Sequence, residues 1–66
     1  MILNRIGVVA AMMRQNLRSV DLAERAGVGY PAICKARTGK PIREATARKI
    51  AAALGVNLED LKEATS

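Results

Sequence analysis

Few side chains in this chain could carry covalent chemistry. Its 66 residues include one cysteine and no histidine, and no acidic pair is embedded among apolar residues, so the sequence offers no recognisable pair of general acid and base. Lys35, beside Cys34, is a cation of the kind that activates thiols, but a small space-filling cysteine on a short helix is the simpler interpretation. These residues predict that the protein is not an enzyme.

The same residue types limit cofactors and location. A single cysteine cannot form an internal disulfide, and without histidine it cannot complete an ordinary zinc site, so we expect no metal and no cofactor. A free thiol fits a reducing cytoplasm. The apolar run over residues 6–13 is far shorter than the roughly 20 residues that span a bilayer, so we expect no membrane contact.

Positive charge is the strongest chemical signal. The formal net charge is +5 at pH 7, and the middle of the chain is basic whereas its end is acidic. Against the single Glu44, residues 35–49 contain the cations Lys35, Arg37, Lys40, Arg43, Arg48 and Lys49. Clustered cations favour a protein that binds a polyanion, although a solvated helix surface gives a similar pattern.

Helices must position these cations, because strand signals are nearly absent. Over residues 2–15, apolar side chains recur at helical spacing on one face, namely Ile2, Ile6, Val9 and Met13. Val8 and Met12 fall on a second face, so this first helix is apolar on two sides. Ser19 can cap a second helix over residues 20–26.

Only three residues separate this second helix from a third, over residues 30–38, whose first turn tolerates Pro31 because the missing N–H has no intrahelical acceptor there. On a helical wheel its inner side carries Ile33 and Ala36, and its outer side carries Tyr30, Pro31, Cys34, Lys35 and Thr38. Two such helices can cross steeply, so that the outer side of the second enters a duplex groove, although short helical hairpins also occur in proteins that do not bind nucleic acid. The core residues for this crossing are present as Leu22, Ala23, Val28 and Ile33.

Two further helices complete the pattern. The fourth has Ala47, Ile50, Ala51 and Leu54 on one face and ends at Gly55. Asn57 and Asp60 resemble a capping box for a fifth over residues 58–64. The prediction is a single compact all-α domain of five helices that spans residues 1–66.

A family resemblance is carried by residues 22–40, which read LAERAGVGYPAICKARTGK. They resemble the helix-turn-helix of the Cro and lambdoid-repressor family of XRE-type regulators, whose usual run is LAxxxGVSxxxIxxxxxGK. The similarity continues through residues 47–56 and 58–61 and covers about residues 8–62. Residues 26–30 also resemble the headpiece of the lactose-repressor family, but the preceding helix and the ending fit the Cro group better.

The resemblance implies a DNA-binding surface in which residues 30–38 form the recognition helix. In the family, its start reads base edges in the major groove, which here means Gly29, Tyr30, Pro31, Cys34 and Lys35. Phosphates would be held at the start of the second helix and around the end of the third, by Arg18, Ser19, Arg37, Thr38, Lys40 and Arg43. The alternative for each residue is ordinary solvent exposure.

Departures from the family pattern are informative. Arg18 and Ser19 stand where the family commonly has Ser or Thr and then Gln, so we expect the helix cap to be shifted by one residue and a phosphate-binding Gln to be missing. Tyr30, Pro31 and Cys34 lack the amide groups that read adenine. We therefore expect modest base discrimination, or discrimination through DNA shape.

If the family alignment holds, one apolar face of the first helix is core and the other has no internal partner. Exposed aliphatic surface usually means association, so we expect a homodimer whose interface includes Ile2, Ile6, Val9 and Met13. The alternative is a first helix that is rotated or sandwiched between the others.

The combined expectation is a sequence-specific regulator that binds double-stranded DNA as a homodimer, acts as a repressor, and works in the cytoplasm of a bacterium, or in a bacterial host if it comes from a phage or mobile element. The length leaves no room for an effector domain, so a stand-alone regulator is expected unless the chain is part of a longer repressor. The alternative function is a protein-interaction module of the same fold, an anti-repressor or adaptor, whose Tyr30 face meets a protein.

Overall fold

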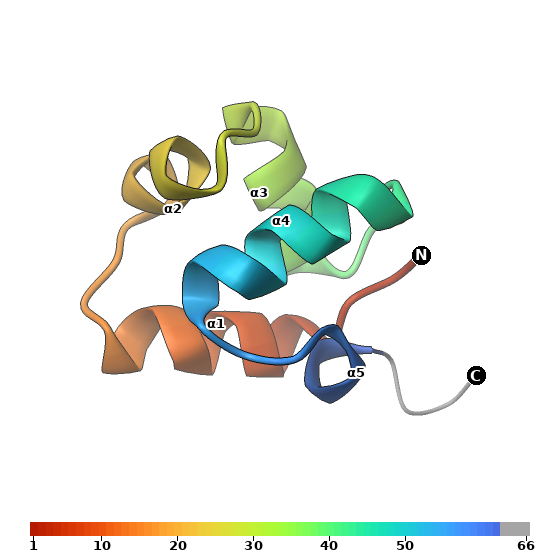
Figure 1. Cartoon of the computed structure of the whole chain (residues 1–66), viewed down its shortest axis with the longest axis horizontal. Helices are drawn as coiled ribbons and strands as arrows, with labels where there is room; N and C mark the ends of the chain where they lie inside the picture. Colours follow the sequence, from red (N-terminus) through yellow and green to blue (C-terminus); the bar gives the residue numbers. More distant parts are fainter. Residues whose placement is uncertain (63–66) are drawn as a thin grey trace.

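Five short α-helices surround a common core in the computed structural model of the chain, which describes residues 1–62 (Figure 1). In chain order they are α1 (Arg5–Arg14), α2 (Ser19–Ala26), α3 (Tyr30–Thr38), α4 (Glu44–Leu54) and α5 (Leu58–Leu61). The predicted all-α class is therefore confirmed. Within residues 1–62, none of the helices combines the length and the apolar character that crossing a lipid bilayer requires.

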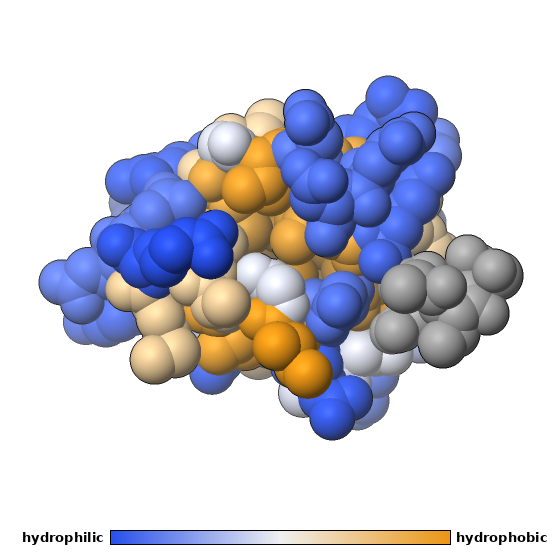
Figure 2. Space-filling view, turned by 90° about the horizontal axis from the view of Figure 1, so that it is seen from below, coloured by the Kyte–Doolittle hydropathy of each residue, from blue (hydrophilic) through white to orange (hydrophobic). Residues whose placement is uncertain are grey.

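The helix α1 is apolar on two sides, and only one of them is buried. Val8 and Met12 lie in the core, as the family alignment predicts, so the alternative of a rotated first helix is wrong. On the outer side, 71% of Ile6 and 75% of Met13 remain exposed. Figure 2 views the molecule from the α1 side and shows apolar surface across the middle of this face, bordered by hydrophilic residues.

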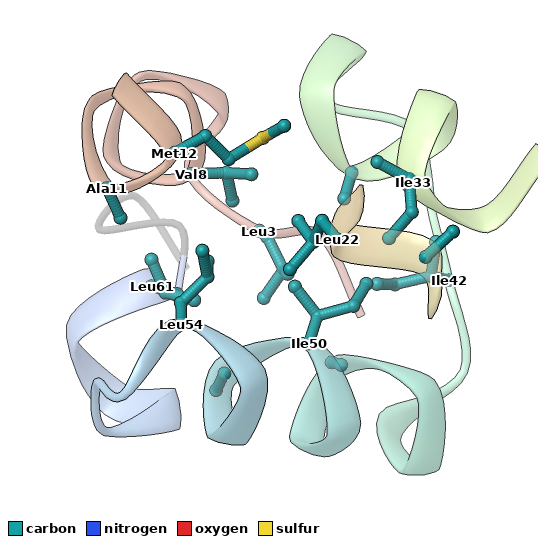
Figure 3. Close-up of a cluster of buried hydrophobic side chains, with 14 residues drawn as sticks. Leu3, Val8, Ala11, Met12, Leu22, Ile33, Ile42, Ile50, Leu54 and Leu61 are labelled. Carbon is teal, nitrogen blue, oxygen red and sulfur yellow. The ribbon is translucent and has the colours of Figure 1, made fainter. Parts of the chain in front are cut away.

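The core is built from small, branched and flexible apolar side chains of all five helices, joined by Leu3 and Ile42 from outside them (Figure 3). Complete burial of one such leucine or isoleucine contributes about 1.5–3 kcal/mol. The predicted inner faces are confirmed: α3 buries Ile33 and Ala36, and the residues that α4 buries are Ala47, Ile50, Ala51 and Leu54.

The prediction for the first helix is wrong at its N-terminus. The helix begins at Arg5 and not at Ile2, because the side-chain oxygen of Asn4 accepts hydrogen bonds from the backbone nitrogens of Ile6 (3.0 Å) and Gly7 (3.3 Å). Ahead of this cap, Leu3 is fully buried and forms an isolated antiparallel bridge with Lys62. Burial of Leu3 therefore keeps the first residues out of the helix.

The shifted cap predicted for the second helix is also wrong. Ser19 is the first residue of α2, and Arg18 is the capping residue. The backbone nitrogen of Arg18 donates to Oδ2 of Asp21 at 3.0 Å, which satisfies this N–H from within the first turn. The carboxylate of Asp21 thus closes the start of the helix.

The last helix is shorter than predicted. It ends at Leu61, and Lys62 takes an extended conformation in its bridge with Leu3; residues 63 and 64, which were predicted to be helical, lie outside the described residues. The predicted capping box is wrong, since the Asn57 side chain makes no capping hydrogen bond. Only the backbone turn from Asp60 N to Asn57 O, at 3.0 Å, marks the helix start.

Candidate nucleic-acid interface

The turn between α2 and α3 fixes how the two helices are joined. Gly27 has φ +71°, and its backbone nitrogen donates to the carbonyl of Ala23 at 2.9 Å, as does that of Val28 at 3.1 Å. This left-handed cap ends α2 and redirects the chain within three residues. Leu22 of α2 and Ile33 of α3 are both fully buried, so the inner sides of the two helices share one core.

With its inner side locked in the core, α3 presents its first turn to solvent. Tyr30 is 54% exposed, and both Pro31 and Lys35 are also exposed. Cys34 is half-buried, and Gly29 precedes the helix as its capping residue without a side chain. The five residues predicted to face base edges therefore lie at the cap and in the first two turns of α3. Their exposed surface combines a phenol ring, a proline and one ammonium group.

The predicted phosphate contacts at the start of α2 take part in two separate interactions. Arg18 pairs with Asp21 through Nε and Oδ2 at 3.1 Å. The hydrogen bond and the charge of Asp21 raise the pKa of Arg18, while the hydrogen bond from Arg18 lowers the pKa of Asp21. Ser19 is buried, and its hydroxyl oxygen accepts a hydrogen bond from the guanidinium of Arg37 on α3. Arg37 is thereby held beside the N-terminus of α2, where free N–H groups favour anions.

At the other end of α3, the predicted residues differ in how free their polar groups are. The hydroxyl of Thr38 donates a hydrogen bond to the carbonyl of Cys34 at 2.8 Å. This hydroxyl can donate to a phosphate only if that bond is broken. Lys40 and Arg43 are exposed. A shallow hollow between α3 and the start of α4 is lined by Ala32, Lys35, Pro41, Ile42, Arg43 and Thr46. It brings Lys35 of α3 and Arg43, eight residues later, to one surface.

The residues predicted for the dimer interface lie on a different part of the surface. We call Ile6, Val9 and Met13 the α1 apolar face; Val9 is half-buried and the other two are exposed. Ile2 is 40% exposed but precedes the helix, so it does not continue this face as a helical residue. A hollow over the face is lined by Arg5, Ile6, Val9, Ala10, Met13 and Arg37.

Two residues, one at the start of α2 and one beside the α1 apolar face, were not among the predicted contacts. Asp21 accepts a hydrogen bond from the backbone nitrogen of Arg18 at the start of α2. Its position three residues after Arg18 has the spacing of a capping box, so this contact could have been predicted from the sequence. Arg5 lines the hollow over the α1 apolar face together with Arg37. No sequence pattern joins Arg5 to Arg37, because their proximity depends on how α1 packs against α3.

Comparison with protein-family models matched residues 9–61 to the family described as Helix-turn-helix. The matched range begins within α1 and contains α2 to α5, including every residue predicted to contact bases or phosphates. Searches of curated proteins and of solved structures found no match.

Proposed function

Because the chain belongs to the Cro and lambdoid-repressor-like helix-turn-helix family of DNA-binding regulators, whose model covers most of its length, we propose that it binds specific double-stranded sites as a homodimer and represses transcription. The observation that carries this proposal is the division of α3 between a fully buried inner side and an exposed outer side with Tyr30, Pro31 and Lys35. Such a helix can enter the major groove without disturbing the core.

In the proposed complex, base edges are met by the first two turns of α3. Lys35 donates to O6 or N7 of guanine, while Tyr30 packs on a sugar or a thymine methyl and Pro31 adds apolar surface. Gly29 allows the backbone to approach, and half-buried Cys34 contributes little area. One ammonium group is a small set of hydrogen-bond donors for recognising base edges directly, so DNA shape carries much of the discrimination between binding sites.

Phosphate contacts position the domain. On one strand they come from Arg18, Ser19 and Arg37 around the start of α2, where the helix dipole adds to the guanidinium charge. On the other side of the groove they come from Thr38, Lys40 and Arg43. Repression follows from occupancy, because a bound domain blocks access of other proteins to the same DNA.

The homodimer is proposed from the exposed α1 apolar face together with Ile2. Ile6 and Met13 expose most of their area to water, and burial against a second copy removes this surface from solvent. Two-fold symmetry then gives an operator with two half-sites, about one helical turn apart.

Selection of bound duplexes from a random-site library, followed by sequencing, tests the proposal. We expect a two-fold symmetric motif, and affinity that falls roughly a thousandfold between 50 and 200 mM salt if about six phosphates are contacted. If no duplex is retained at low salt, DNA binding is wrong and the protein-interaction alternative, through the Tyr30 surface, takes its place.

Lys35→Ala tests the base contact. We expect about tenfold weaker binding to the selected site and relaxed preference at one base pair, because a side-chain contact to a base edge is lost. Lys62→Ala is the matched control, since it removes the same charge next to α5, on the opposite side of the molecule from α3 (Figure 1). If Lys35→Ala binds DNA with unchanged base preference, Lys35 does not contact a base edge, although the proposal of DNA binding still stands.

A further inference from the structure

Two hollows on the α1 side of the molecule form one continuous groove. The first lies over the α1 apolar face, and the second extends past the end of α1 to Leu17 and the start of α2. Val9, Met13 and Arg37 line both hollows, so the floor comes from α1 and one side comes from α3. The ten residues of α1 alone are about 15 Å long, which is the length of nearly three turns of a second helix.

The floor of this groove is an apolar stripe at helical spacing. Ile6, Val9 and Met13 follow one another at intervals of three and four residues, and most of the area of Ile6 and Met13 is exposed. Figure 2 shows this apolar surface with hydrophilic residues along its edges. A stripe of this kind fits the apolar face of an amphipathic helix, whose own side chains repeat at the same intervals. The flexible side chain of Met13 can adapt to the side chains that it meets.

The edges of the groove carry cations and no carboxylate. Arg5 lines the groove at the start of α1, and Arg37 lines it on the α3 side. Both arginines are exposed, and in the ion pairs found among residues 1–62 the cations are Arg18 and Arg48. Arg5 and Arg37 therefore have no acidic partner within that part of the chain.

Arg37 is held in a position to receive an anion. Its guanidinium donates a hydrogen bond to the hydroxyl of Ser19, which keeps the side chain at the boundary between the two hollows. A guanidinium has five N–H donors, so this bond leaves others for a carboxylate in the groove.

These charges decide between two occupants of the groove. A second copy of this chain brings the same arginines to the same apolar contact, so like charges approach and each guanidinium loses water without gaining a partner. A helix with carboxylates beside its apolar face instead pairs with Arg5 and Arg37 while it covers Ile6 and Met13. The groove is therefore complementary, in charge and in apolar character, to an acidic amphipathic helix.

We propose that this groove binds an acidic amphipathic helix of another protein, with apolar side chains on Ile6, Val9 and Met13 and carboxylates beside Arg5 and Arg37. The bound helix covers the α1 apolar face, so it excludes the second copy of the proposed homodimer. It also occupies Arg37, which is proposed to hold a DNA phosphate, and so lowers the affinity for DNA. This regulatory effect rests on the proposed function, whereas binding of the helix does not.

Selection from a library of displayed helices tests the groove without DNA. The library presents helices of about 14 residues with random side chains at the exposed positions, and the target is the full chain at about 50 mM salt, where charges are weakly screened. We expect the enriched helices to combine apolar residues at i, i+3, i+4 and i+7 with an excess of Asp and Glu at the flanking positions. Equal numbers of acidic and basic residues at those positions would overturn the proposal.

Charge reversal then locates the enriched helix, which is made as a synthetic peptide and followed by fluorescence anisotropy. Arg37→Glu and Arg5→Glu should each weaken peptide binding about fivefold or more, because an ion pair becomes a repulsion, and Ile6→Asp should abolish binding. Arg5→Glu leaves the bond from Arg37 to Ser19 in place, so it tests the charge alone. Arg14→Glu is the matched control, because Arg14 is an exposed cation of α1 outside both hollows, and it should change binding less than about twofold. If reversal at Arg5 and at Arg37 has no effect, the helix does not lie in this groove and the proposal is wrong.

A competition experiment connects the groove to the proposed function. The peptide should weaken binding of the selected duplex and shift the protein from dimer to monomer in sedimentation equilibrium. If peptide and duplex bind together without weakening each other, the shared use of Arg37 is wrong. If no duplex is bound while the peptide binds with the expected charge dependence, the proposed function fails and the acidic-helix groove stands. If DNA is bound and Ile6→Asp dissociates the dimer while no acidic helix is enriched, a second copy occupies the groove and the acidic helix is wrong.

Discussion

At the scale of single residues, Asp21 makes the stability of the folded chain depend on pH through the start of α2. Its Oδ2 accepts from both the backbone nitrogen and Nε of Arg18, and these hydrogen bonds lower the pKa of Asp21 below its ordinary value. The folded chain then holds the proton less tightly than the unfolded chain. The resulting stabilisation is complete above the unfolded pKa, near pH 4, and is lost as pH falls through the lowered folded pKa.

Asp21→Asn should therefore lower Tm at pH 7, and the difference from the wild type should shrink below about pH 4, where the carboxylate of the unfolded wild type begins to take up a proton that the folded chain still excludes. Thermal melts by circular dichroism at pH 7, 4 and 3 measure this. Glu24→Gln is the control, because Glu24 is exposed on the same helix and forms no ion pair among the described residues. A Tm difference that stays constant down to pH 3 would contradict the assignment.

Some residue-scale features follow from sequence and others do not. The exposure of Tyr30 and Lys35 follows from the helical period, because Ile33 and Ala36 fix the inner side of α3. The bond between Arg37 and Ser19 does not follow, since it depends on how α2 crosses α3. The position of Thr38 on the outer side of α3 follows from the sequence. The hydrogen bond from its hydroxyl to a carbonyl of its own helix does not.

At the scale of elements, the turn between α2 and α3 depends on Gly27. Its φ of +71° is a left-handed conformation that costs a residue with a Cβ about 1–2 kcal/mol, although no atom beyond this residue and its two chain neighbours lies within 4 Å of the place where that Cβ would stand. Gly27→Ala should therefore lower the free energy of unfolding by about 1 kcal/mol through backbone strain alone. Urea denaturation measures it.

Gly29→Ser is the control in the same turn. Gly29 has φ −70°, which any residue adopts, and it occupies the capping position of α3, where serine is favoured over glycine by a few tenths of a kcal/mol. This variant should be as stable as the wild type or slightly more stable. Equal destabilisation by both variants would show that the turn is sensitive to side-chain size and not to backbone conformation.

The ends of the elements were the least predictable part of the fold. Ile2 stands one helical turn before Ile6, so the apolar spacing extends the first helix too far. What decides the boundary is Leu3, whose burial against distant residues is invisible in a local pattern. By contrast, α3 and α4 were located well because a proline marks the start of α3 and a glycine follows the end of each.

At the scale of the whole molecule, residues 1–4 join segments that are distant in the chain. The backbone nitrogen of Ile42 donates to Met1 O at 2.8 Å, and that of Asn4 donates to Leu61 O at 2.6 Å. Leu3, between these bonds, points into the core between the helices (Figure 3). The start of the chain therefore fastens α5 and the segment after α3 to the same core.

Leu3→Ala should consequently lower the free energy of unfolding by about 2–5 kcal/mol, the usual range for a fully buried leucine. A chain of 66 residues has roughly 3–10 kcal/mol in total at 0.05–0.15 kcal/mol per residue, so this single loss should leave a measurable unfolded fraction at 37 °C. Urea denaturation followed by circular dichroism gives the value. Ile2→Ala is the matched control, because the neighbouring side chain is 40% exposed and its truncation should cost far less. If both variants lose the same stability, Leu3 does not fasten the ends of the chain to the core.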